Sequence, residues 1–215
     1  MKWMRIPWIM GEQNTMNLQL DDTKARQVAA EILRHYPNHE TSRLVLLKML
    51  YLANRRSIED RGIPMVPDRY TAMDHGPVLS EVYNLIKHES RLYRWWGRAQ
   101  RAWSECFQNK KCVAKGDERR IFLKSDPGDD RLSKYDKRII RELFEAFGSS
   151  DSKLYEHAHS LPEYAKNEPQ PKSANPISLA DICQAVGRED VTESILVERQ
   201  NRWRRVQQEI ERVGL

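Results

Sequence analysis

The stretch that decides the fold reads Asp68-Arg-Tyr-Thr-Ala-Met-Asp-His-Gly-Pro-Val-Leu-Ser-Glu-Val-Tyr83. The residues from Arg69 to Met73 predict a short strand. Asp74-His-Gly-Pro77 predicts a turn, because Gly allows backbone dihedrals that other residues avoid and Pro fixes its own φ. From Val78 to about Lys87 the apolar residues recur at helical spacing, and we expect Pro77 to set the first helical φ.

Helical patterns flank this stretch on both sides. The helix before it begins after Thr41 or Ser42, carries apolar residues on nearly every face and ends at Gly62, so we expect it to run through the core. Further helices are expected over 21–36, 133–148, 153–159, 178–187 and 192–213. A strand is expected at 119–124, within a basic hairpin that spans about Lys110 to Lys124.

The composition is that of a water-exposed globular chain. It has 215 residues, 36 Lys+Arg against 31 Asp+Glu, and a formal net charge of +5. A charged fraction of 31% and a mean hydropathy of −0.76 exclude a membrane protein. The three cysteines form neither a disulfide framework nor a CxxC pair, which favours a reduced, cytoplasmic environment. We expect no signal peptide and no membrane span, with Met16 as an alternative start to Met1.

The expected fold class is mainly α. It is a compact helical domain with a small β-hairpin or short β element and a C-terminal helical extension. We divide the chain into an N-terminal tail (1–20), the helical domain (21–166), a linker (167–176) and the extension (177–215). Three prolines in ten residues mark the linker.

The histidines and glycines give no catalytic pattern. The six histidines are His35, His39, His75, His88, His157 and His159. Only the last two are close, and two residues apart on a helix they point to different faces. HExxH, CxxC, nucleophile-elbow and P-loop motifs are absent from the sequence. We therefore expect no catalytic residues, no metal site, no cofactor and no enzymatic activity.

The near-balance of charge over the whole chain hides a local basic segment. Between Arg91 and Lys124 there are ten Lys/Arg and only three acids. Its first part, from Arg91 to Trp103, interleaves basic and aromatic residues, which suits phosphate contacts and base stacking. The same tryptophans could instead pack in the core while the arginines cover its edge. Both interpretations stay open at this point.

Further motifs accompany the opening stretch. Lys48-Met-Leu-Tyr-Leu-Ala53 lies on the expected core helix, and Gly62-Ile-Pro64 follows it. Downstream come Leu132-Ser133 and His157-Ala-His-Ser-Leu-Pro-Glu-Tyr164. Together with the opening stretch, these residues resemble the Panacea domain family of SocA-like antitoxins, which includes proteins once labelled phage-associated.

The resemblance covers about Thr41 to Lys166. Two positions depart from the family pattern: Tyr164 stands where Trp is usual, and Ala158 stands where Ser is common. The resemblance implies an antitoxin of a toxin–antitoxin system that neutralises a cognate protein toxin by direct contact, the toxin being encoded next to it. Members of the family are paired with unrelated toxins.

Two alternative functions remain beside direct neutralisation. One is a proteolytic adaptor that presents the toxin to a protease, in which case a protease or chaperone is a further partner. The other is a nucleic-acid-binding regulator, which the basic segment would serve. All three roles imply a cytoplasmic protein that needs no membrane.

The expected site residues fall into two groups. The family motif residues are expected to be mainly structural, and they are Lys48, Tyr51, Tyr70, Met73, Gly76, Pro77, Tyr83 and His159. Arg69 and His75, on the strand and its turn, are expected to contact the partner. Because partner choice should lie outside the family core, we also expect contacts from Arg94, Trp95, Trp96 and Arg98.

Overall fold

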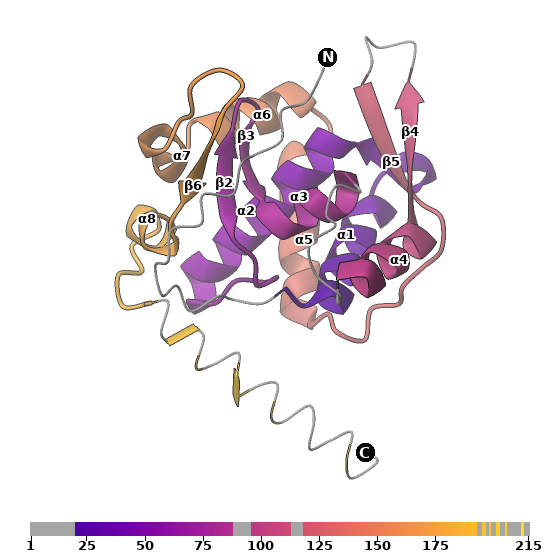
Figure 1. Ribbon diagram of the computed structural model, residues 1–215, viewed down its shortest axis with the longest axis horizontal. Helices are drawn as coiled ribbons and strands as arrows, with labels where there is room; N and C mark the ends of the chain where they lie inside the picture. The colour runs from indigo at the N-terminus through magenta and orange to yellow at the C-terminus, as the bar shows by residue number, and fades with distance from the viewer. Residues whose placement is uncertain are drawn as a thin grey trace.

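The computed structural model describes residues 20–87, 96–112 and 118–192, and beyond them 195, 196, 198, 201, 202, 205 and 212; at 96, 111, 112 and 118 it describes the backbone alone. In this part of the chain, eight α-helices and six short strands form a helical domain with two small antiparallel sheets (Figure 1). The predicted mainly α class is confirmed.

The elements follow one another closely along the chain. The helices are α1 (Asp22–Arg34), α2 (Arg43–Arg61), α3 (Ser80–Lys87), α4 (Trp96–Cys106), α5 (Lys134–Phe147), α6 (Asp151–His159), α7 (Pro162–Lys166) and α8 (Leu179–Ala185), with a 3-10 turn η1 (Pro37–His39) after α1. The strands are β1 (Glu40–Ser42), β2 (Tyr70–Met73), β3 (Gly76–Leu79), β4 (Phe107–Cys112), β5 (Glu118–Leu123) and β6 (Ala174–Ile177).

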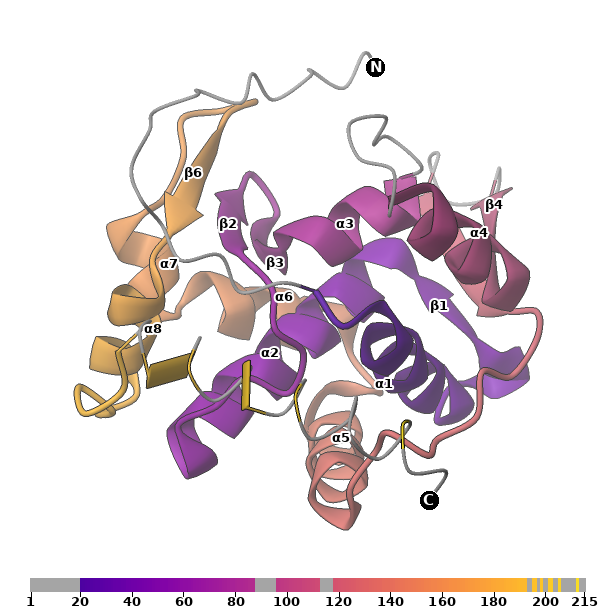
Figure 2. The same cartoon turned by 60° about the horizontal axis from the view of Figure 1, so that its bottom comes forward.

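Helix α2 runs through the centre of the domain, as predicted. The helices α1, α5 and α6 and the β2–β3 hairpin pack around it (Figure 2). Its buried residues occupy nearly every face between Val45 and Ile58. The Ser42 hydroxyl caps it by accepting a hydrogen bond from the Leu44 N–H at 3.2 Å, and Gly62 ends it in the left-handed conformation.

Two other helix starts differ from prediction by one or two residues. Asp21, rather than Asp22 or Thr23, caps α1 through the Lys24 N–H. Ser150, rather than Ser152, caps α6. In both cases the residue with extended backbone dihedrals directly before the helix takes the cap, because only there does a side-chain oxygen reach the free N–H groups.

The predicted strand at 69–73 is confirmed as β2, but the residues after the turn differ from prediction. Pro77 lies in strand β3, opposite Ala72, and not at the first position of a helix. It is tolerated there because β3 is the edge strand of its sheet, where a missing N–H costs no ladder bond.

The helix after this hairpin therefore begins at Ser80 and not at Val78. The cause is the buried Asp68 carboxylate, which accepts hydrogen bonds from the N–H groups of Glu81 (2.9 Å) and Val82 (3.0 Å). An acid that precedes the helix by twelve residues thus acts as its cap.

Part of the segment predicted as a linker, 167–176, is a strand. Its last residues belong to β6, which pairs antiparallel with β2 and places Ile177 opposite Tyr70. Ile177 is buried, as are Ile182 and Cys183 on α8. The prolines do not prevent the pairing because β6 is also an edge strand. The predicted helix at 178–187 is confirmed as α8, whereas the helix at 192–213 lies mostly outside the described residues.

The second sheet has the order β1-β5-β4, and it carries the predicted basic hairpin. The strand expected at 119–124 is confirmed as β5, and β4 is its partner in the hairpin. Helix α4 precedes the hairpin and buries Trp103 against Phe107, with ring centroids 4.4 Å apart. For Trp103, the core-packing interpretation is therefore correct.

The C-terminal segment is fastened to the end of α2. The Arg188 guanidinium donates a hydrogen bond to the Glu59 carbonyl oxygen at 3.2 Å and lies against Gly62. Val191 is buried beside it. The left-handed turn at Gly62, which has no side chain, thus leaves room for Arg188 and Val191, more than 120 positions further along the chain.

Replacing Gly62 by Ala should destabilise the protein more than the same change at Gly187. Both glycines have positive φ (+65° and +69°), so each substitution carries a strain of about 1–2 kcal/mol. Only at Gly62 would the new Cβ meet neighbours, 2.5 Å from Arg188 Nη2 and 2.7 Å from Val191 Cγ2. We expect Gly62→Ala to lose about 1 kcal/mol more in urea unfolding. Equal losses would contradict a close contact there.

Candidate partner-binding site

Lys48 lies at the centre of the motif residues. It is the one charged residue in the middle of α2 and is fully buried, and its Nζ donates a hydrogen bond to the Pro77 carbonyl oxygen at 2.9 Å. Burial lowers the pKa of Lys48 to about 7. A Cβ on Gly76 would lie 3.1 Å from Nζ and 2.9 Å from His159 Cδ2. The turn therefore sits directly on the lysine, and with a φ of +91° it requires glycine.

A second buried polar group joins α2 to α7. The Glu163 carboxylate is 1% exposed, and its Oε1 accepts hydrogen bonds from the Tyr51 hydroxyl (3.1 Å) and from Arg55 Nε (2.8 Å). The Tyr51 ring packs edge-on against Tyr70 of β2, with centroids 6.0 Å apart. The motif tyrosines thus link the central helix, the hairpin and α7.

His159 and Tyr164 cover the other side of the turn. Their rings are stacked with centroids 5.2 Å apart, and the Tyr164 hydroxyl donates to the Met73 carbonyl oxygen at 3.0 Å. Burial, together with the nearby Lys48 ammonium, lowers the pKa of His159. Met73 is half-buried against the core, and Tyr83 is buried on α3. Of the eight motif residues, His159 alone is exposed at its surface.

The predicted partner residues do not form one surface in the described part of the chain. Arg69 is exposed and pairs with Glu81 of α3. His75 is exposed in the β2–β3 turn, and Arg98 is exposed on α4. Helix α3 lies between the hairpin and α4 (Figures 1 and 2).

The other three predicted partner residues are not described at the side-chain level. Arg94 and Trp95 lie outside the described residues, and Trp96 is described only as part of the α4 backbone. Their predicted contacts stay predictions.

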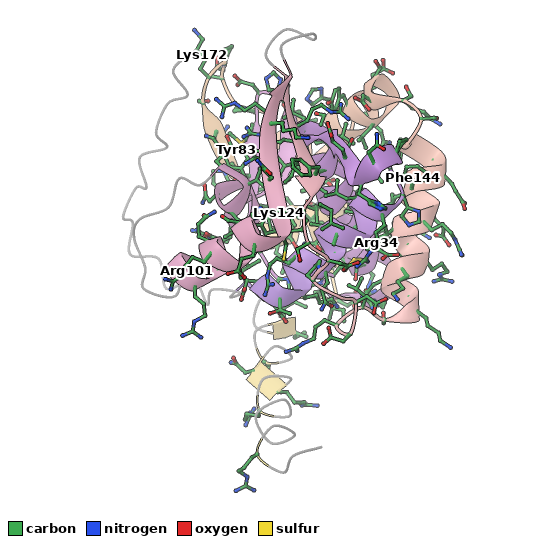
Figure 3. All side chains as sticks on the ribbon, turned by 90° about the vertical axis from the view of Figure 1, so that its right-hand side faces the viewer. Arg34, Tyr83, Arg101, Lys124, Phe144 and Lys172 are labelled. Atoms are coloured by element: carbon green, nitrogen blue, oxygen red, sulfur yellow. The ribbon has the colours of Figure 1, made fainter. Side chains whose placement is uncertain are left out.

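A basic face is formed by α4 and the β4–β5 hairpin. We define it by its four exposed cations, Arg98, Arg101, Lys110 and Lys124. Figure 3 turns this side toward the viewer and labels Arg101 and Lys124. Among the described residues, no carboxylate lies within ion-pair distance of any of them.

Sequence reasoning assigned no role to three buried polar residues. Asp68 caps α3, Glu163 binds Tyr51, and Asn54 holds the Val66 backbone by donating to its carbonyl oxygen (2.6 Å) and accepting from its N–H (2.7 Å). Burial raises the pKa of Asp68 to about 7, while the N–H groups that it binds oppose the rise. Of these three residues, only Asn54 could have been recognised from the sequence, because it is a polar residue inside a helix that is apolar on nearly every face.

The described residues contain no group of three or more His, Cys, Asp or Glu side chains arranged to hold a metal ion. Within the same residues, no helix combines the length and the apolar character needed to cross a bilayer.

Lys48 should make the stability of the protein rise with pH. Its pKa is about 7 in the folded state against about 10.4 in an unfolded chain, so unfolding takes up a proton between these values. The free energy of unfolding should therefore rise by up to about 1.4 kcal/mol per pH unit from pH 7.5 to 9. Lys48→Met should remove this slope and Lys134→Met, at an exposed position, should keep it. Urea unfolding at several pH values gives the free energy of unfolding of each protein as a function of pH. The same slope between pH 7.5 and 9 for wild type and Lys48→Met would contradict the prediction.

Glu163→Gln should destabilise the protein by about 1–3 kcal/mol, because it leaves the Arg55 guanidinium largely buried without a charged partner. Glu156→Gln, at an exposed position on α6, is the matched control and should change stability by less than about 0.5 kcal/mol. Thermal unfolding followed by circular dichroism compares the two. Similar losses at both positions would contradict the structural role of Glu163.

One comparison with known proteins identifies the family. The family model described as "Antitoxin SocA-like, Panacea domain" matches residues 46–163, which is more than half of the chain. Neither the search of curated proteins nor the search of solved structures found a match. The matched range contains the Lys48–Pro77 contact, the hairpin, the basic face and Glu163. The chain therefore belongs to the SocA-like antitoxin family with a Panacea domain.

Proposed function

We propose that the protein is the antitoxin of a toxin–antitoxin pair and that it neutralises a protein toxin by binding it directly in the cytoplasm, without catalysis. The observation that carries the proposal is the family match over 46–163, because the family is named for antitoxins. The family name describes the role in general terms, and direct binding is our extension of it.

The arrangement of buried ionisable groups supports a binding role. Lys48 donates to the turn, Asp68 caps α3 and Glu163 accepts from two side chains of α2. Each group is thus engaged by the scaffold and withdrawn from solvent. General acid–base catalysis needs such a group within reach of a substrate. These residues instead hold the surface elements in fixed positions.

One observation favours a second candidate, a nucleic-acid-binding regulator. The basic face offers cations that are free to contact phosphates, and phosphate contacts dominate nucleic-acid affinity. A proteolytic adaptor would also have to bind the toxin before the protease degrades it, so toxin binding does not distinguish an adaptor from an antitoxin that acts by binding alone.

Co-expression tests the proposal. The product of the reading frame adjacent to this one should arrest growth when it is expressed alone, and co-expression of the full chain should restore growth. The two proteins should then co-elute in size-exclusion chromatography, because direct binding predicts a stable complex. A copy of the gene with an early stop codon is the control, because it produces the transcript without the full protein and should not restore growth.

Either of two results would contradict the proposal. One is an adjacent product that is harmless when expressed alone. The other is rescue of growth without a complex between the purified proteins. A gel-shift series with a 20-base-pair duplex addresses the second candidate, since phosphate-driven binding weakens steeply as salt rises.

A further inference from the structure

The cations of the basic face differ from most others in the described part of the chain. Elsewhere, most arginines have a carboxylate partner within 4 Å, and these are Arg26, Arg34, Arg55, Arg56, Arg61, Arg69, Arg120, Arg138, Arg141, Arg188 and Arg202. The four cations of the basic face have none among the described residues. Unpaired cations such as Lys134 and Lys172 also occur elsewhere, but the basic face gathers four of them on α4 and the β4–β5 hairpin.

The register of the β4–β5 hairpin adds to this charge. Lys110 lies directly opposite Arg120. Like charges at directly opposed positions of an antiparallel pair destabilise it. Arg120 is compensated by its ion pair with Glu40 of β1, whereas Lys110 has no carboxylate partner among the described residues. An anion bound at Lys110 would reduce the remaining repulsion.

The outer face of the hairpin is not purely charged. Phe107 and Ile121 point into the core, so the alternation of the strands places Gln108, Lys110 and Phe122 on the outside. Lys110 Nζ lies 4.1 Å from the centroid of the Phe122 ring. A hollow of about 390 Å³ opens beside this face and is lined by Ser104, Phe107, Gln108, Asn109 and Lys124.

Strand β4 also has a free edge. It is the last strand in the order β1-β5-β4, and among the described residues no strand pairs with its outer side. Its backbone N–H and C=O groups on that side are able to pair with an added strand. The free edge and the basic face meet at Lys110.

We propose that the basic face and the free edge of β4 dock a carboxylate-rich surface of the toxin. The inference rests on the proposed function and names the surface and the chemistry of the partner. Carboxylates would compensate the four cations, and charge of opposite sign would speed the encounter of the two proteins. A strand of the toxin would complete the hydrogen bonding of β4.

Two features favour an acidic protein over a nucleic acid. The Lys110 ammonium lies over one face of the Phe122 ring and occupies a position where a base would stack. Backbone groups at a strand edge suit another strand. Binding of nucleic acid at this face is therefore an outcome that would overturn the proposal.

The test compares two double variants with the same change in net charge. Lys110→Glu/Lys124→Glu reverses two charges of the basic face. Lys134→Glu/Lys172→Glu reverses two exposed lysines on α5 and beside β6, and it is the control. The probe is the product of the adjacent reading frame, and the readouts are growth rescue on co-expression and the association rate of the purified proteins.

We expect the control to match wild type in both readouts. The basic-face variant should associate at least tenfold more slowly at low salt, and its association rate should lose most of its dependence on salt. Circular dichroism checks that both variants are folded. Should Lys110→Glu/Lys124→Glu not fold, Lys110→Gln/Lys124→Gln removes the charges without reversing them and should show a smaller decrease in rate.

The other outcomes separate the two proposals. If wild type and both variants rescue growth and associate equally fast, the inference about the surface is wrong while the antitoxin function stands. If wild type itself fails to rescue, the proposed function is wrong and the inference goes with it. If the basic-face variant keeps its association rate with the toxin but loses binding to a 20-base-pair duplex, the face binds nucleic acid and the inference is overturned.

Discussion

The contact between the Lys48 ammonium and the Pro77 carbonyl oxygen constrains the elements around it. An ammonium inside a protein is costly unless it is well partnered, and here a backbone oxygen of the turn is 2.9 Å away. The turn has to sit directly on α2 to supply that oxygen. Because so little space remains between the turn, Nζ and the His159 ring, position 76 accepts only glycine. Strand β2 is fixed as a consequence, and β6 is aligned on β2.

Residues far along the chain meet at the same place. Glu163 reaches Tyr51 across 112 positions of sequence, and Tyr164 reaches Met73 across 91. One short segment, α7, therefore holds both the central helix and the hairpin. Interiors of this kind are sensitive to single changes, because removing one partner leaves the other buried and unsatisfied. Most of the motif residues thus contact one another, and the position of the hairpin depends on these contacts.

Local patterns in the sequence predicted the helices α1, α2, α3, α5, α6 and α8 and the strands β2 and β5, but they missed α4, α7 and β3 and could not predict long-range partners. Ser42, Gly62 and Ser133 mark helix ends through contacts within a few residues, and such contacts are visible in sequence. The start of α3 depends on Asp68, and the strand β6 exists because β2 offers it an edge. For the candidate site, Arg98 was predicted from the basic segment, while the free edge of β4 could be seen only once the strand order was known.

The family motif residues and the cations of the basic face differ in how much a substitution costs the stability of the fold. The motif residues are mostly buried and mutually bonded, so exchanging one costs stability. The cations of the basic face are exposed and carry no ion pair among the described residues, so exchanging one costs the fold little. The proposed binding of a toxin needs a surface of this second kind on a scaffold of the first. Trp103, Phe107 and Ile121 hold the α4–β4–β5 unit to the core from inside. Its outer cations can therefore be exchanged at little cost to the fold.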